Sequence, residues 1–123
     1  MTEAEKEQLV TSLEKEAQVI LTELAGFAKP DVVNPDFFVV SVEENDRGLE
    51  DNATDLTEYE RLVALANTLT KRLVEIRLAI KKIKAGEYGK CEHCSVSIQS
   101  SRLLVMPVAR YCIECAKVKL REA

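Results

Sequence analysis

All four cysteines of this chain lie in two doublets within its last third, and each doublet encloses two residues. The first doublet, "CEHC", contains Cys91 and Cys94, and the second doublet, "CIEC", contains Cys112 and Cys115. The 17 residues between them match the spacing of a four-thiolate zinc site. Each doublet can place two sulfurs on one ion, and four thiolates leave no open coordination position. The sequence therefore predicts a structural zinc ion held by all four cysteines.

Other uses of paired cysteines fit the sequence less well. A C-x-x-C redox pair usually begins a helix that follows a strand, whereas the first doublet follows a long helical pattern and a glycine-containing turn. An iron or iron–sulfur site also takes four thiolates and is the alternative metal centre. His93, the only histidine, lies between the first two predicted ligands. It could replace a thiol, but with four thiols available we expect it to face solvent.

The segment around the doublets offers little apolar material for a core. We expect a small core formed by Ile98, Leu103, Leu104, Val108 and Tyr111. So few apolar side chains do not fold a module of this size alone. A structural zinc site supplies on the order of 10 kcal/mol and can make up the difference. The residues after Cys112 read as a short final helix.

Two stretches before the cysteines carry the 3–4 spacing of a coiled-coil seam. The seams consist of Val10, Leu13, Ala17, Ile20, Leu24 and Phe27, and of Tyr59, Leu62, Ala66, Leu69, Leu73, Ile76, Ile80 and Ile83. Thr2 and Glu5 match a capping box, which predicts that the first helix begins at once and ends near Gly26. The second helix is predicted over residues 55–84, with Gly86 just beyond its end.

The simplest way to bury both seams is to pair them as an antiparallel hairpin, and dimerisation through the same seams is the alternative. Only 5% of residues are aromatic and 31% are charged, which favours helical rods over a thick globular core. We therefore expect a mainly α fold. Residues 1–86 would form an antiparallel coiled-coil helical hairpin, and residues 87–123 a C-terminal four-cysteine zinc finger with a short terminal helix.

Residues 28–54 form the predicted acidic tip or linker of the hairpin. Because the connection is too long for a tight turn, we expect it to be functional or disordered, and its apolar cluster argues against full disorder. Its apolar cluster predicts a short strand or flap packed on the hairpin end, with an exposed partner-binding patch as the alternative. The cluster consists of Phe37, Phe38, Val39, Val40 and Val42, and acidic residues follow it.

The net charge of −4 combines an acidic half with a basic half. Residues 1–60 contain 4 Lys/Arg and 16 Asp/Glu, whereas residues 61–123 contain 13 Lys/Arg and 5 Asp/Glu. Such asymmetry indicates two ends with different tasks. The acidic N-terminus does not resemble a signal peptide, and no apolar run approaches the roughly 18 residues of a membrane span. We expect a cytoplasmic protein without a membrane partner, in a compartment that keeps thiols reduced.

The motifs "GEYGKCEHC" and "RLLVMPVARYCIEC", preceded by the heptad helix, resemble the DksA/TraR family of bacterial transcription regulators over residues 45–120. The resemblance implies that the hairpin enters the secondary channel of RNA polymerase and that the zinc head packs near the hairpin base. The family's tip pattern, Asp-x-x-Asp-x-Ala, falls on "GLEDNA". Asp51 and Ala53 are thereby implied as polymerase-contacting tip residues, while Gly48 departs from the pattern.

The same resemblance bears on ppGpp, a nucleotide that some family members bind jointly with polymerase. A lysine of the second helix falls on Glu75, and another, directly after the last cysteine, falls on Ala116. Acidic and apolar side chains cannot hold pyrophosphates, so we do not expect ppGpp to participate. The glycine that usually follows the second cysteine is Ser95 here, a replacement that we expect to cost little.

The leading hypothesis is a monomeric transcription regulator that binds RNA polymerase and makes no sequence-specific DNA contacts. The sequence contains no acid–base pair around a pocket, so we expect no enzyme. One alternative is a zinc finger that binds nucleic acid through its basic tail, and another is a zinc-capped coiled-coil scaffold. The basic tail consists of Lys81, Lys82, Lys84, Lys90, Arg102, Arg110, Lys117, Lys119 and Arg121.

Overall fold

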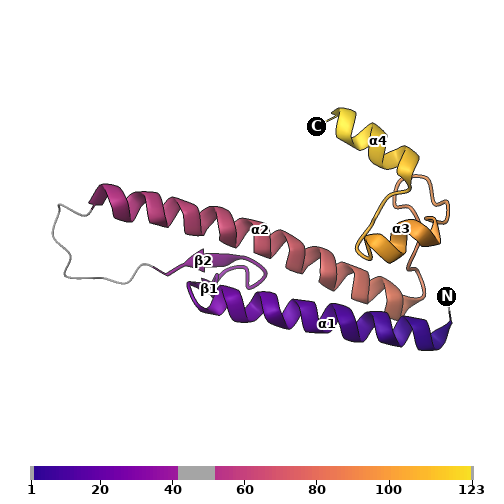
Figure 1. The fold of residues 1–123 in the computed structure, drawn as a ribbon, viewed down its shortest axis with the longest axis horizontal. Coiled ribbons are helices and arrows are strands. Elements are labelled where there is room, and N and C mark those ends of the chain that lie inside the picture. The colour runs from indigo at the N-terminus through magenta and orange to yellow at the C-terminus, as the bar shows by residue number, and fades with distance from the viewer. Residues whose placement is uncertain (1, 42–51, 123) are drawn as a thin grey trace. The chain divides into compact units, whose positions relative to one another are not determined.

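The computed structural model describes residues 2–41 and 52–122, and the side chains of residues 2–41 and 56–118 (Figure 1). The fold is mainly helical, as predicted. Its elements are α1 (Glu3–Ala25), β1 (Ala28–Pro30), β2 (Phe38–Val40), α2 (Asn52–Ala85), α3 (Ser100–Val105) and α4 (Ile113–Glu122). Within the described residues, no helix combines the length and apolar character that crossing a bilayer requires.

Helix α1 begins with the predicted capping box. The backbone N–H of Glu5 donates to Thr2 Oγ1 at 3.2 Å, and the backbone N–H of Thr2 donates to the Glu5 carboxylate at 3.3 Å. These bonds satisfy two backbone groups at the helix start. The helix ends at Ala25, and the N–H of Gly26 donates to the carbonyl of Glu23 at 3.1 Å. Both predicted ends of this helix are confirmed.

Helix α2 is slightly longer than predicted and ends where glycine allows it to end. Gly86 follows the helix with a φ of +76°. Its N–H donates to the carbonyl of Ile83 at 3.2 Å, and the N–H of Glu87 donates to the carbonyl of Lys82 at 2.9 Å. This pair of bonds is a Schellman motif, which needs a left-handed residue at the position of Gly86. The predicted role of Gly86 is confirmed.

The chain divides into two compact units, one formed by Met1–Glu14 with Glu75–Ala123 and the other by Lys15–Val74. Each unit contains a segment of α1 and a segment of α2, which run in opposite directions within it (Figure 1). The predicted seams supply most of the buried side chains of these segments. They are Leu13, Ile20, Leu24, Ala66, Leu73, Ile76 and Ile83.

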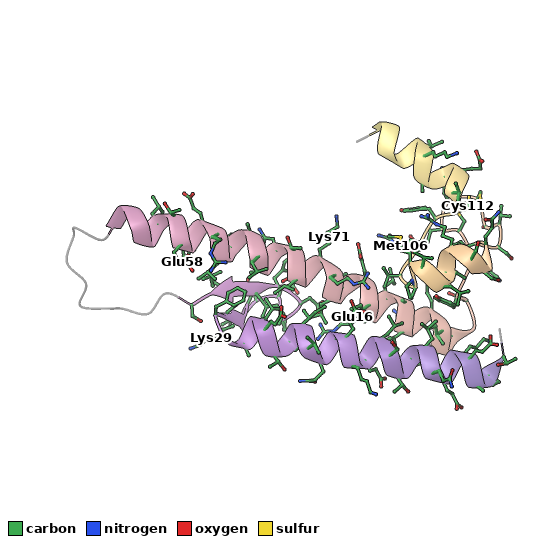
Figure 2. The ribbon with its side chains drawn as sticks, in the orientation of Figure 1. Glu16, Lys29, Glu58, Lys71, Met106 and Cys112 are labelled. Atoms are coloured by element: carbon green, nitrogen blue, oxygen red, sulfur yellow. The ribbon has the colours of Figure 1, made fainter. Side chains whose placement is uncertain are left out.

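An ion pair joins the two helices within Lys15–Val74. Arg72 of α2 donates through Nε to Glu16 Oε1 of α1 at 2.8 Å and through Nη2 to Oε2 at 3.2 Å (Figure 2, where Glu16 is labelled). Two parallel N–H···O bonds hold a carboxylate in one orientation. The pair therefore links turns of α1 and α2 that lie opposite each other.

The linker begins with a two-stranded antiparallel sheet, so the predicted short strand is confirmed. In the sheet, Ala28 lies opposite Val40, Lys29 opposite Val39, and Pro30 opposite Phe38. Ala28 and Val40 are buried, whereas Val39 and the preceding Phe37 are more than half exposed. Strand alternation thus divides the part of the apolar cluster from Phe37 to Val40 between the core and the surface, whereas Val42 lies outside the described residues.

The segment around the four cysteines, called the cysteine module here, has a small core of Cys91, Ile98 and Leu103, against which Tyr88, Ala109, Tyr111, Cys112 and Cys115 pack. Val108 is also buried. The prediction of Leu104 as a core residue is wrong, because this side chain is 83% exposed. Successive residues of a helix are rotated by about 100°, so α3 can direct Leu103 to the core only by turning Leu104 away.

Candidate metal centre

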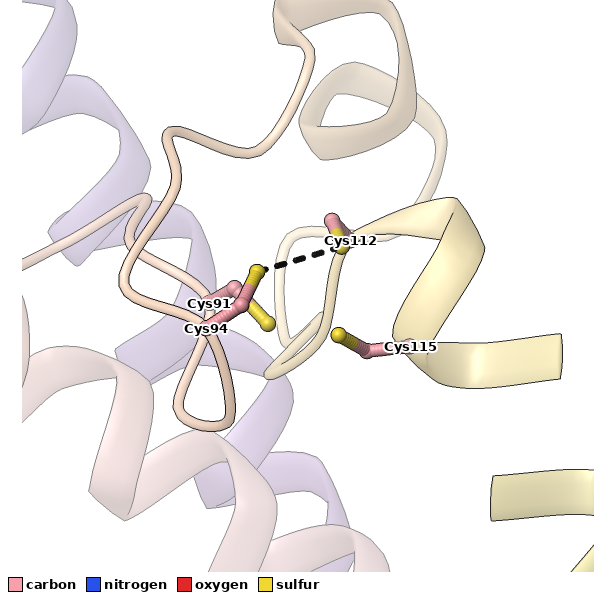
Figure 3. A group of neighbouring side chains, drawn as sticks. All are labelled: Cys91, Cys94, Cys112 and Cys115. Atoms are coloured by element: carbon pink, nitrogen blue, oxygen red, sulfur yellow. Dashed lines mark hydrogen bonds between the residues drawn. The ribbon is translucent and has the colours of Figure 1, made fainter. Parts of the chain in front are cut away.

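The first doublet lies in a tight turn after α2. Cys91 donates its N–H to the carbonyl of Val96 at 2.8 Å, and Ser95 donates its N–H to the carbonyl of Cys91 at 3.0 Å. Lys90 and Ser97 form an antiparallel bridge at the base of the turn. Because these bonds close the backbone on itself, the sulfurs of Cys91 and Cys94 are presented together (Figure 3).

The second doublet is placed by the start of a helix. Cys112 immediately precedes α4 and Cys115 lies in its first turn, where the N–H of Ala116 donates to the carbonyl of Cys112 at 2.9 Å. A backbone bond at 2.9 Å from Glu92 N–H to the Arg110 carbonyl joins this segment to the first doublet. The 17-residue arm thus brings the two doublets together, as the cysteine spacing predicts.

The four sulfurs form one cluster. They all lie within 4.8 Å of one another (Figure 3), and the distance from Cys94 Sγ to Cys112 Sγ is 3.7 Å. Sulfurs that lie about 2.3 Å from a tetrahedral zinc ion are about 3.8 Å apart, whereas disulfide sulfurs are about 2.05 Å apart. The donor set and its spacing fit zinc. The cluster therefore supplies the geometry of a closed, structural metal site.

The thiols of the cluster differ in pKa because of their surroundings. Burial raises the pKa of Cys91, but the backbone N–H groups of Cys112, Cys94 and His93 outweigh this effect and lower it to about 6. The pKa of Cys115 is raised far above its usual range, first by the Cys112 side chain and then by burial. Four crowded thiolates therefore require a cation, and bound zinc supplies the charge that stabilises them together.

Ser95 adopts a backbone conformation that favours glycine. Its φ is +63°, the only positive φ of a non-glycine residue within the described ranges. The left-handed region costs about 1–2 kcal/mol for a residue with a side chain. The positive φ of Ser95 implies a backbone cost of this size, whereas the sequence alone predicts that the replacement of glycine by serine costs little. The strain is tolerated because the turn around the first doublet determines the conformation.

Glu92 forms an ion cluster beside the metal centre that the sequence did not predict. Its carboxylate accepts hydrogen bonds from Arg110 Nε at 2.9 Å and from Lys82 Nζ at the end of α2. The hydrogen bond from Arg110 is the main reason that the pKa of Glu92 is lowered; burial opposes the shift and Lys82 adds to it. The only signal in the sequence is an acidic residue between two cysteines, which does not identify its partners.

His93 faces solvent, as predicted, and it also makes a contact that the sequence did not predict. Its side chain is exposed, and its Nδ1 lies 3.6 Å from Cys115 Sγ. The contact links the first doublet to a cysteine 22 positions further along the chain, and no periodicity or motif reports such a pair.

The predicted tip residues are not placed. Asp51 lies outside the described residues, as do residues 42–50 with the rest of the acidic segment. Ala53 belongs to the first turn of α2, but its side chain is also outside the described part. Their roles remain predictions.

Residues 86–119 match the family model described as the prokaryotic dksA/traR C4-type zinc finger. An uncharacterized protein of Aquifex aeolicus is 42% identical over 64 residues, which are 52% of this chain and 44% of the relative. The RNA polymerase-binding transcription factor DksA of Buchnera aphidicola subsp. Acyrthosiphon pisum is 35% identical over 65 residues, 53% of this chain and 43% of that protein. The chain thus spans less than half the length of these curated relatives.

A solved structure extends the likeness to the whole fold. The structure of transcription factor DksA2 from Pseudomonas aeruginosa matches with a TM-score of 0.75 at 23% identity, over 99% of this chain and 88% of the other. At this identity the match concerns the arrangement of the backbone. It agrees with the predicted mainly helical fold with a terminal four-cysteine module.

Proposed function

We propose that the chain is a member of the DksA/TraR family, whose C4-type zinc finger matches residues 86–119, and that it is a transcription regulator that binds RNA polymerase. The observation that carries the proposal is the match of residues 86–119 to the family's finger, within which four sulfurs converge. Two further findings support it. The Buchnera relative bears the name of an RNA polymerase-binding transcription factor, and the fold resembles that of transcription factor DksA2.

The proposal divides the chain by task. Residues 1–86 form the coiled-coil hairpin, with its acidic tip or linker at residues 28–54, and residues 87–123 form the zinc-finger module. The hairpin enters the secondary channel of RNA polymerase and brings Asp51 and Ala53 towards the catalytic centre. A carboxylate delivered there alters the electrostatic field around a metal-dependent, nucleic-acid-filled site. The protein acts in the cytoplasm, as a monomer.

Zinc has a structural role in this proposal, and Cys91, Cys94, Cys112 and Cys115 are its ligands. Four thiolates saturate the ion, so it cannot bind and activate a water molecule. The module's core is small, and metal binding supplies the free energy that keeps it folded. The protein is therefore a regulator and not an enzyme.

Three basic residues of the tail are engaged in contacts within the protein. Lys82 and Arg110 share the single carboxylate of Glu92, and Arg102 Nε donates to the carbonyl of Tyr111 at 3.1 Å. Charges that are already paired contribute little to the release of counterions from a nucleic acid, which drives binding to its phosphates. We therefore propose no sequence-specific DNA binding.

The proposed activity does not depend on ppGpp. At one of the family's lysine positions stands Glu75, whose negative charge acts on Arg110. At the other stands Ala116, in the first turn of α4. A carboxylate repels pyrophosphate, and a methyl group offers it no hydrogen bond.

The proposal is tested by binding to core RNA polymerase and by transcription in vitro. We expect the purified chain to bind the polymerase and to lose this binding when the secondary channel is already occupied. Asp51→Asn should abolish the effect on transcription while zinc content and helicity stay unchanged. Asp31→Asn is the matched control, because asparagine keeps the oxygen that accepts the Val33 N–H at 3.0 Å.

Two results would count against the proposal at different levels. An unaltered transcriptional effect of Asp51→Asn would contradict the tip role while leaving polymerase binding intact. Absence of binding to polymerase, together with a stable homodimer, would favour the scaffold alternative. Tight and salt-sensitive binding to bare DNA would favour the nucleic-acid alternative.

A further inference from the structure

The imidazole of His93 lies beside the metal centre and not within its ligand set. Its Nδ1 is 3.6 Å from Cys115 Sγ. Among the described residues, the potential ligand atoms that lie within 4.8 Å of one another are the four cysteine sulfurs and do not include the imidazole. The ring therefore contacts one sulfur of the cluster from outside.

His93 belongs to the first doublet and contacts the second. It lies in the chain between Cys91 and Cys94, and its side chain reaches Cys115 of the second doublet. Within the described part of this module, few other side-chain contacts join residues so far apart in the sequence. The contact of Arg110 with Glu92 is one of them, with a separation of 18 positions. A residue of one doublet that contacts the other is well placed to set the position of one relative to the other.

We propose that His93 is a positioning residue that donates its Nδ1–H to the Cys115 thiolate in the zinc-bound protein. A neutral imidazole has one N–H donor and one acceptor nitrogen, and a zinc-bound thiolate only accepts. The contact therefore selects the tautomer with hydrogen on Nδ1. A hydrogen bond to a charged acceptor is stronger than one between neutral groups, so it fixes the Cys115 side chain and withdraws charge from its sulfur.

Partners that bond to metal ligands from outside the coordination sphere typically contribute about 10- to 100-fold in metal affinity. The side chain of His93 is exposed to water, which weakens any hydrogen bond that it makes. We therefore expect an effect at the lower end, about 10-fold. This inference rests on the zinc site alone and stands whether or not the chain binds polymerase.

Three substitutions of His93 in the 123-residue chain separate the hydrogen bond from the shape of the side chain. His93→Leu removes the donor. His93→Asn keeps a donor nitrogen at the branch position that corresponds to Nδ1. His93→Phe is a second variant without a donor that keeps a planar ring. Gln99→Ala is the control within the same module, because the Gln99 side chain makes no capping hydrogen bond to α3.

The measurements are zinc affinity, by competition with a chelator, and the thiolate-to-metal charge-transfer absorption of the Co²⁺-substituted protein. We expect His93→Leu and His93→Phe to bind zinc about 10-fold more weakly. Their charge-transfer band should move to longer wavelength, because a sulfur without the hydrogen bond is a stronger electron donor. His93→Asn should restore both quantities towards those of the parent, and Gln99→Ala should change neither.

Three results would overturn the proposal. The first is parental affinity and band position in both variants without a donor. The second is an asparagine variant as impaired as the leucine variant, which would reduce the role of His93 to packing. The third is a parental charge-transfer band with the intensity of three thiolates that increases to the intensity of four thiolates in His93→Leu. That result would show that the imidazole is itself a ligand of the metal. Circular dichroism shows which variants fold. If only one of His93→Leu and His93→Phe folds, the comparison of that variant with His93→Asn still decides the test.

Discussion

The guanidinium of Arg110 lies 2.7 Å from the carboxylate of Glu92, so an ion pair links the two cysteine doublets in addition to the metal site. Glu92 stands between Cys91 and Cys94, and Arg110 stands two residues before Cys112. Lys82 adds the end of α2 to the same carboxylate. Ion pairs therefore link the two cysteine doublets to each other and to the end of α2, in addition to the metal site that the sulfurs form.

Replacing Glu92 by glutamine should destabilise the zinc-bound protein by about 1 kcal/mol at neutral pH, because partly exposed ion pairs contribute up to about that amount. The pKa of Glu92 is lowered from its ordinary value of 4.5, mainly by the hydrogen bond from Arg110. The contribution is therefore complete above about pH 4.5 and is lost as the pH falls through the folded pKa. Urea unfolding of parent and variant at each pH measures the difference.

The matched control for Glu92 is Glu114→Gln, which changes the corresponding charge within the second doublet. Glu114 forms no ion pair within the part of the chain that the structure describes, so its substitution should change the free energy of unfolding by less than about 0.5 kcal/mol. Zinc is released from all of these proteins in acid, so only differences at equal pH are informative. A difference between parent and Glu92→Gln that persists unchanged into acid would contradict the role of the carboxylate.

The pair of Arg72 and Glu16 should show a measurable coupling between α1 and α2. The two side chains are 35% and 42% exposed, so solvent screens them, and we expect about 0.5 kcal/mol. A double-mutant cycle with Arg72→Gln and Glu16→Gln, followed by urea unfolding, isolates the pairwise contribution. Arg61 and Glu58 form a comparable pair within α2 alone. Additive effects at Arg72 and Glu16 would show that the pair does not couple the helices.

Ser95→Gly should stabilise the zinc-bound protein by about 0.5–1 kcal/mol. Glycine reaches a φ of +63° without the steric cost that serine incurs there, although the greater freedom of glycine in the unfolded chain removes part of the gain. Ser97→Gly is the control, because Ser97 pairs in the bridge with Lys90 and should lose stability. Thermal unfolding measures both variants. A destabilised Ser95→Gly would mean that the serine makes a compensating contact.

Leu103 and Leu104 are adjacent leucines with opposite surroundings. Leu103→Ala should destabilise the protein by about 2–4 kcal/mol, because it leaves a cavity in the core of the cysteine module. Leu104→Ala removes a side chain that is 83% exposed and should change stability by less than about 0.5 kcal/mol. The free energy of unfolding of the zinc-bound variants tests the contrast. Equal costs would mean that the exposed surface of α3 is covered in solution.

Features that depend on neighbours in the chain were readable from the sequence. The capping box of Thr2 and Glu5, the helix end at Gly86 and the buried seams follow from interactions over three to seven residues. In the same way, the two residues between the cysteines of each doublet indicate a turn that places both sulfurs on one ion. Each of these patterns has one favourable local conformation, so its residue types identify it.

The sequence did not reveal α3, because six residues are too few to show a period, and it therefore placed Leu104 in the core. Nor did it reveal the contacts of His93 with Cys115 or of Glu92 with Lys82 and Arg110. These pairs are separated by 10 to 22 positions. They exist only because the closed sulfur cluster brings distant backbone together, and local preferences along the chain do not encode which side chains then meet.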